Sequence, residues 1–288
     1  MKLLITGGSG FLGRRTAAYF AGTGHQVLAP QHSQLDITDL PSLEKWFRDH
    51  TPEAVIHTAA VSDTGLCQRE PEWSERINVT GCVNLAKVCR KYGARLVICS
   101  SDQIYAGSEY PGPHREEEPL TPGTVYGRQK LRAEQRCLEI LPETVCLRLS
   151  WLYARQDLPG DHGHFLAVLK TSLADESKSL SWPIHDRRGL TDVDVLVRNL
   201  PAALELEGGS WNFGSENDSS THDTLKSVLE DLGMESALRR LKPNMEPFRD
   251  NPRDISMDLT KLKSAGIDFP TTRESLRLAL IELAGQTC

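Results

Sequence analysis

The 288-residue sequence lacks the features that would place it in a membrane or on nucleic acid. No apolar run approaches the roughly 20 residues that a membrane-spanning helix needs. Residues 1–6 run straight into glycines, which is too short for a secretory signal. Acidic residues outnumber basic ones, and the formal net charge is −6. We therefore expect no nucleic-acid partner and no membrane partner.

Cysteine pairs and metal-ligand clusters are also missing. The seven cysteines are scattered, and none forms a Cys-x-x-Cys pair, so we expect reduced core residues and a cytoplasmic protein. His162 and His164 share a polar loop in which only Asp161 stands at ligand spacing. We expect these histidines to face solvent or substrate, and we expect no catalytic metal.

The first half of the chain alternates short apolar runs with amphipathic stretches. The pattern predicts strands over 2–6, 26–29, 54–57, 95–99 and 144–149, and helices over 11–21, 41–50, 72–92 and 125–141. Such alternation is typical of a parallel sheet covered on both faces. We therefore expect an α/β fold of the Rossmann type, with a doubly wound parallel sheet.

The pattern changes after residue 154. A polar loop over 155–163 precedes predicted helices over 165–174, 221–232, 260–265 and 273–284, with one further strand over 210–213. The segment 242–253 holds three prolines and is expected to be irregular. We predict a nucleotide-binding domain over 1–154, to which 189–214 return. A smaller C-terminal substrate-binding lobe takes 155–188 and 215–288.

A glycine-rich turn follows the first predicted strand. Gly7, Gly10 and Gly13 have the spacing Gly-x-x-Gly-x-x-Gly and lead into an amphipathic helix. Glycines at these places let the backbone approach a pyrophosphate, which the helix N-terminus attracts. A plain strand-to-helix turn is the alternative, but this context favours a dinucleotide site.

The end of the second strand bears on the choice of cofactor. Asp36 could accept a hydrogen bond from an adenine amino group, or it could be a loop or capping residue. Residues 29–33 contain no acidic residue. An acidic side chain at this place would bind the ribose hydroxyls and repel a 2′-phosphate. This absence favours NADP, with NAD as the alternative. Arg14 and Arg15 could add positive charge, although a solvated helix face explains them equally well.

Tyr126 and Lys130 form the most informative pair. Residues four apart share a helix face, so both can point into one site. A nearby ammonium lowers the pKa of a phenol from about 10, which suits proton transfer at a carbinol oxygen. In isolation the spacing could be a surface pair. Ser101 follows the fourth strand and could bind the substrate oxygen or simply cap the next turn.

Together these motifs resemble the extended short-chain dehydrogenase/reductases, and most closely the dTDP-4-dehydrorhamnose reductase branch, which includes the regulatory beta subunit of methionine adenosyltransferase. The resemblance covers almost the whole chain. It implies a Ser101, Tyr126 and Lys130 triad. It also implies a cofactor site formed by Tyr126, Lys130 and the residues Gly7, Gly10, Phe11, Leu12, Gly13, Asp36, Ile37, Ala59 and Ala60.

By the same resemblance the substrate is a nucleotide-sugar. Candidate contacts are Asp102, Gln103 and Trp151, with Arg187 and Arg188 as a grip for a phosphate. Trp151 could instead be a core residue, and the arginines a solvated charge run. The segment 64–68 departs from the branch by lacking its acids, and Gln103 stands where the branch has tyrosine. Gln103 cannot act as a base, so a dehydratase is disfavoured.

We therefore expect an NAD(P)H-dependent reductase of a nucleotide-sugar ketone. The alternatives are a cofactor-binding regulatory subunit with little turnover and a sugar-nucleotide epimerase. A homodimer is an open expectation.

Overall fold

The computed structural model describes residues 1–161 and 163–285, which divide into two compact units. The first unit comprises Met1–Ser108, Pro119–Leu149 and Val197–Asn212, and the second comprises Glu109–Glu118, Ser150–Leu196 and the chain from Phe213 onward. The chain thus leaves the first unit and returns to it before the second is complete.

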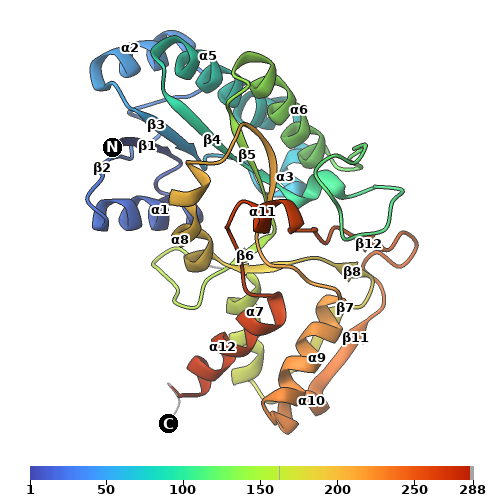
Figure 1. The fold of residues 1–288 in the computed structure, drawn as a ribbon. Helices are drawn as coiled ribbons and strands as arrows, with labels where there is room; N and C mark the ends of the chain where they lie inside the picture. Colours follow the sequence, from blue (N-terminus) through green and yellow to red (C-terminus); the bar gives the residue numbers. More distant parts are fainter. Residues whose placement is uncertain (162, 286–288) are drawn as a thin grey trace. The chain divides into compact units, whose positions relative to one another are not determined.

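The first unit is built on a six-stranded sheet with the order β10-β5-β4-β3-β1-β2 (Figure 1). The strands are β1 (Lys2–Thr6), β2 (Gln26–Leu28), β3 (Ala54–His57), β4 (Arg95–Ser101), β5 (Val145–Leu149) and β10 (Gly209–Phe213). β1 pairs in parallel with β2 and β3, and β4 pairs in parallel with β3 and β5. The order reverses beside β1, so the expected doubly wound sheet is confirmed.

Helices cover both faces of this sheet (Figure 1). They are α1 (Phe11–Gly22), α2 (Leu40–His50), α5 (Cys82–Tyr92) and α6 (Val125–Ile140). Leu43 and Phe47 of α2 and Leu85 of α5 are fully buried in one core cluster with Leu4 and Val55 of the sheet. This burial of apolar faces fixes the strand ends, and hence the loops that follow them.

The predicted helix over 72–92 is wrong as one continuous α-helix. It begins as α4 (Pro71–Glu75), widens into a π-helical turn η1 (Arg76–Gly81) and continues as α5. Asn78 in this turn accepts a hydrogen bond from Val61 N at 2.8 Å, and a Cβ on Gly81 would lie 2.5 Å from Ile37 Cδ1. These two tertiary contacts fix a turn that helical periodicity does not reveal. A short helix before it, α3 (Thr64–Arg69), was not predicted.

The second unit carries three small parallel pairs rather than one large sheet. They are β6 (Trp151–Tyr153) with β9 (Leu190–Asp192), β7 (Leu180–Pro183) with β11 (Leu241–Asn244), and β8 (Asp186–Arg187) with β12 (Arg253–Asp254). The expectation of an irregular 242–253 is wrong at both ends, because β11 and β12 lie there. Pro243 is tolerated in a two-stranded pair, where an edge position needs no donor.

Helices of the second unit pack on these pairs around Tyr153, Phe165, Leu225 and Leu276, all fully buried. They are α7 (Phe165–Ala174), α9 (Thr221–Asp231), α10 (Glu235–Arg240) and α12 (Thr272–Gly285), and α11 (Thr260–Ser264) is a further short helix of this unit. α8 (Val193–Ala203), which was not predicted, begins in this unit and ends in the first.

Candidate active site

The glycine turn after β1 is held by close contacts that only glycine allows. Gly7 has a φ of 72°, and a Cβ there would lie 2.7 Å from Ala59 N. A Cβ on Gly13 would lie 2.1 Å from Gly7 O. Gly10 N donates to Gly7 O at 2.8 Å and closes the turn. The turn therefore lies directly against the backbone of Ala59, just after β3, and the free amides of the first helix lie at the carboxyl end of the sheet.

A cavity of about 290 Å³ opens beside this turn. Gly7, Asp36, Ile37 and Ala59, four of the predicted cofactor residues, line it. So do two side chains that sequence reasoning missed, His32 and Trp73. The walls are largely apolar and the glycines leave room for a close approach, so the residues present fit the adenosine end of a dinucleotide.

Asp36 is oriented by its own loop. Its Oδ1 accepts from both the backbone N and the Oγ1 of Thr38 at 2.8 Å. Burial raises the pKa of this carboxyl, but the Thr38 hydrogen bonds and the charges of His32 and Arg76 outweigh it, and the pKa is lowered. Asp36 is thus an anion at the cavity, suited to accept a hydrogen bond from a ligand.

Further predicted cofactor residues lie at the start of α1 and after β3. Phe11 and Leu12 form its first turn, and Ala60 lies half-buried next to Ala59. Arg15 lies under Phe11, donating to Phe11 O at 3.1 Å with its guanidinium 4.5 Å from the ring centroid. Because Arg15 is buried in that contact, the structure does not support it as a source of charge for a 2′-phosphate.

Tyr126 and Lys130 lie on one buried face of α6. Thr124 caps this helix by accepting from Gly127 N at 3.0 Å. A Cβ on Gly127 would lie 2.4 Å from Gln103 O, so the helix start packs tightly on the turn that follows β4. Lys130 Nζ donates to Cys99 O at 2.7 Å, which fixes the ammonium at the end of β4.

Ser101 ends β4 and begins the 3₁₀ turn η2 (Asp102–Tyr105). Its hydroxyl accepts from Gln103 N and donates to Asp102 Oδ1, both at 3.2 Å. A side-chain hydrogen bond between Ser101 and Tyr126 also acts to lower the pKa of the phenol. The structure therefore brings Ser101, Tyr126 and Lys130 together, and the capping interpretation of Ser101 holds alongside.

Burial changes the expected acidity of the pair. It raises the pKa of Tyr126, and the opposing effects of Lys130 and Ser101 do not cancel it, so the phenol is protonated at neutral pH. The expectation of a lowered phenol pKa is wrong in this respect. Burial lowers the pKa of Lys130. Tyr126, two thiols and Glu134 together raise it by more, so the net shift is upward. Lys130 remains an ammonium ion.

The predicted substrate residues fall into two groups. Asp102 and Gln103 are buried in η2, in the first unit. In the second unit the Arg188 guanidinium lies 5.1 Å from the centroid of the Trp151 ring. Arg187 points elsewhere, its Nη1 lying 3.8 Å from Asp254, so the two arginines do not form one grip.

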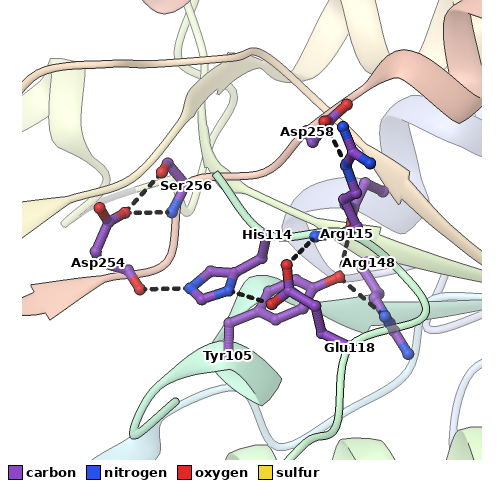
Figure 2. A network of polar contacts seen from close by, with 9 residues as sticks. Tyr105, His114, Arg115, Glu118, Arg148, Asp254, Ser256 and Asp258 are labelled. Atoms are coloured by element: carbon purple, nitrogen blue, oxygen red, sulfur yellow. Dashed lines mark hydrogen bonds and ion pairs between the residues drawn. The ribbon is translucent and has the colours of Figure 1, made fainter. Parts of the chain in front are cut away.

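Two histidines of the second unit, His164 and His114, are engaged in structural contacts. His164 Nδ1 accepts from Ala167 N at 3.2 Å, and its Nε2 lies 2.7 Å from Asp157. His164 is buried, so the expectation that it faces solvent is wrong. His162 lies outside the described residues. His114 lies between Glu118, at 2.7 Å, and Asp254 O, at 2.9 Å (Figure 2).

Three buried polar residues of the first unit were missed. His57 bonds Thr6 Oγ1 through Nδ1 at 2.6 Å, and Arg148 pairs with Glu134. Two signals were available: Arg148 interrupts an apolar strand, and Glu134 stands four residues after Lys130. Charges in such positions are buried only when they are paired.

The cysteines are as expected in the part of the chain that the structure describes. Six lie there, all buried and free, and Cys288 is outside it. Among the described residues no three His, Cys, Asp or Glu side chains gather as metal ligands. None of the described helices is both long and apolar enough to cross a membrane.

Comparison with known proteins identifies the family. The model of the RmlD substrate binding domain matches residues 1–284. The dTDP-4-dehydrorhamnose reductase of Mycolicibacterium smegmatis is 32% identical, with 99% of this chain and 87% of that protein covered. The methionine adenosyltransferase 2 subunit beta of Pongo abelii is 24% identical, over 92% and 83%.

A solved structure shares the fold. The dTDP-4-dehydrorhamnose reductase of Bacillus anthracis, in complex with NADP, superimposes with a TM-score of 0.81 at 21% identity, and 98% of each chain is covered. With the family model spanning nearly every residue and a relative above 30% identity over 99% of the length, the chain belongs to the RmlD substrate-binding-domain family, that of the dTDP-4-dehydrorhamnose reductases.

Proposed function

We propose that this protein is an NADPH-dependent reductase of the 4-keto group of a dTDP-sugar, of the dTDP-4-dehydrorhamnose type. The observation that carries the proposal is the buried, protonated Tyr126 phenol beside the Lys130 ammonium and Ser101. The 32% identity to a named reductase over 99% of the chain supports the same reaction.

The chain's own groups handle the proton. Reduced nicotinamide, when bound, supplies the hydride that a ketone needs. The Ser101 hydroxyl holds the ketone oxygen, and the Tyr126 phenol donates its proton to that oxygen as negative charge develops there. Lys130, fixed on Cys99 O, then stabilises the phenolate that remains. A phenol that is protonated at neutral pH suits the reducing direction.

NADP is the proposed cofactor. Residues 29–33 offer no carboxylate to repel a 2′-phosphate, and His32 lines the cavity at this place. The assay is the ratio of KM for NADPH to KM for NADH. A KM for NADH below that for NADPH would contradict the choice.

Trp151 and Arg188 are proposed to hold the nucleotide-sugar, with Asp102 and Gln103 near the sugar. Arg188 stacks on Trp151, and a planar cation on an aromatic face can bind a phosphate while the ring packs on a base or sugar. Arg187 is the less suitable phosphate ligand, since it faces Asp254.

The activity is tested by following NADPH absorbance with dTDP-4-dehydrorhamnose and other 4-keto dTDP-sugars. We expect substrate-dependent oxidation that Tyr126→Phe lowers by at least about a hundredfold, the usual contribution of a general acid. Tyr92→Phe is the matched control, because Tyr92 is a half-buried tyrosine of α5 whose hydroxyl donates to Glu44 O.

Other outcomes favour the alternatives. NADPH binding with no oxidation of the cofactor, together with a co-purifying protein, favours a regulatory subunit. Tightly bound oxidised cofactor with interconversion of sugar epimers favours an epimerase. The homodimer stays a prediction, which a measurement of the molar mass in solution by light scattering would test.

A further inference from the structure

A buried arginine joins the two segments that carry the proposed catalytic residues. Arg148 of β5 and Glu134 of α6 form an ion pair at 2.9 Å, with their side chains 4% and 2% exposed. Arg148 Nη1 donates to Tyr105 Oη at 2.9 Å (Figure 2). Glu134 belongs to the helix of Tyr126 and Lys130, and Tyr105 belongs to the turn that begins after Ser101.

The contacts at both ends are specific. Arg148 Nε reaches both Glu134 oxygens, at 3.3 and 3.2 Å. Tyr105 Oη donates onward to Asn212 Oδ1 at 2.7 Å, and Ser210 Oγ donates to Glu134 Oε2 at 2.9 Å. A planar guanidinium can serve two partners in fixed directions, whereas an ammonium ion cannot.

The position of Glu134 along α6 connects the ion pair to the proposed catalytic residues. Tyr126, Lys130 and Glu134 are spaced four apart, so they share one face and turn together when the helix rotates. Glu134 fixes that rotation against β5, while Tyr105 fixes η2 against the same guanidinium. The strand β5, the helix α6 and the turn η2 are thus joined by the Arg148 side chain, which contacts none of the proposed reacting groups.

We propose that Arg148, with Glu134 and Tyr105, is a positioning device that sets the separation between the Ser101 and Tyr126 hydroxyls. The expected effect on kcat rests on the proposed function, whereas the claim about the distance between the two hydroxyls does not. A pair that served stability alone would lower the melting temperature when removed and leave turnover per folded molecule unchanged.

Tyr105→Phe is the first variant, because it removes the hydrogen bond between Arg148 and η2 while the ion pair and the contact of the guanidinium with the ring remain. We expect kcat to fall between about tenfold and a hundredfold, the effect of misplacing reacting groups by up to an ångström, with KM for NADPH within about twofold. Phe47→Ala is the control, since it removes a fully buried core ring away from the site and should lower stability without lowering kcat. An unchanged kcat in Tyr105→Phe overturns the proposal.

A second variant covers failure to fold. Glu134→Leu with Arg148→Met replaces the ion pair by apolar groups, a change that often preserves or raises stability. We expect it to fold, bind NADPH and lose kcat in the same range. Full kcat in this double variant overturns the proposal.

A structural measurement separates this inference from the proposed function. If none of the 4-keto dTDP-sugars makes the wild type oxidise NADPH, the proposed function fails. Crystal structures of the wild type and Tyr105→Phe, or of the double variant, then decide the inference through the distance from Ser101 Oγ to Tyr126 Oη. An altered distance supports the positioning role, and an unchanged one refutes it.

Discussion

Replacing Gly7 by alanine tests the dinucleotide turn most directly. Gly7 has a φ of 72°, which costs a residue with a Cβ about 1–2 kcal/mol. The new Cβ would also lie 2.7 Å from Ala59 N and 2.8 Å from Ala59 Cα. These are backbone atoms that cannot rotate away, so overpacking adds about 1–3 kcal/mol. Gly7→Ala should therefore lower the free energy of unfolding by about 2–5 kcal/mol.

Gly93→Ala is the matched control for the backbone contribution. Gly93 has a φ of 70° at the end of α5, and a Cβ there would meet no atom within 4 Å. This variant should lose only about 1–2 kcal/mol. Gly13→Ala supplies the opposite case, because Gly13 is helical and its Cβ would lie 2.1 Å from Gly7 O.

The assays are urea unfolding and titration with NADPH by its fluorescence. We expect Gly7→Ala and Gly13→Ala to weaken NADPH binding by more than about tenfold, since moving Ala59 or the first turn of α1 by the needed amount costs over ~1.4 kcal/mol. Gly93→Ala should bind normally. The reasoning is refuted if Gly7→Ala and Gly93→Ala lose equal stability and bind NADPH alike.

Three further predictions concern single side chains. Burial, and then the charge of Lys130, lowers the pKa of His57 to about 3. The unfolded chain takes up a proton near pH 6.5 that the folded protein refuses, so stability should fall as the pH drops from about 6.5 to 3, by up to about 1.4 kcal/mol per pH unit. Unfolding of His57→Leu across this range should show a shallower slope, and an unchanged slope speaks against a neutral buried imidazole. Asp36→Asn should raise the Kd for NADPH about tenfold, the value of one charge-assisted hydrogen bond. Asp49→Asn, at an exposed position of α2, should not change this Kd. Equal Kd values for the two variants would remove Asp36 from the site. Phe47→Ala should lower the free energy of unfolding by about 3–5 kcal/mol in urea titrations, and a loss below 1 kcal/mol would contradict its place in the core.

Local spacing was enough to predict the sheet and the residues that meet at its carboxyl edge. Gly7, Gly10 and Gly13 are close in sequence, and Tyr126 and Lys130 are one helical turn apart, so short-range geometry brings each set together. The parallel order then places Asp36, Ala59 and Ser101 at the same edge, because each lies at the end of a strand or after it.

Contacts between distant segments were beyond such reasoning. The π-helical turn at Asn78 depends on Val61, 17 residues away, and β11 exists only through its pairing with β7. Arg187 and Arg188 were grouped because they are adjacent, yet β8 ends at Arg187 and Arg188 begins the loop that follows. Arg187 therefore meets Asp254 while Arg188 meets Trp151.

The acidity of Tyr126 shows why a motif can predict a candidate catalytic pair and still mislead about its acidity. The sequence shows that an ammonium stands one turn away, and this by itself favours the phenolate. It does not show how completely the fold removes water from the phenol, and that larger effect raises the pKa. Because a ketone reduction consumes a proton, a phenol held in its protonated form is ready to act without first collecting one. Burial, which arises from the packing of α6 on the turn after β4, thus keeps the phenol in the protonated form that the proposed ketone reduction requires.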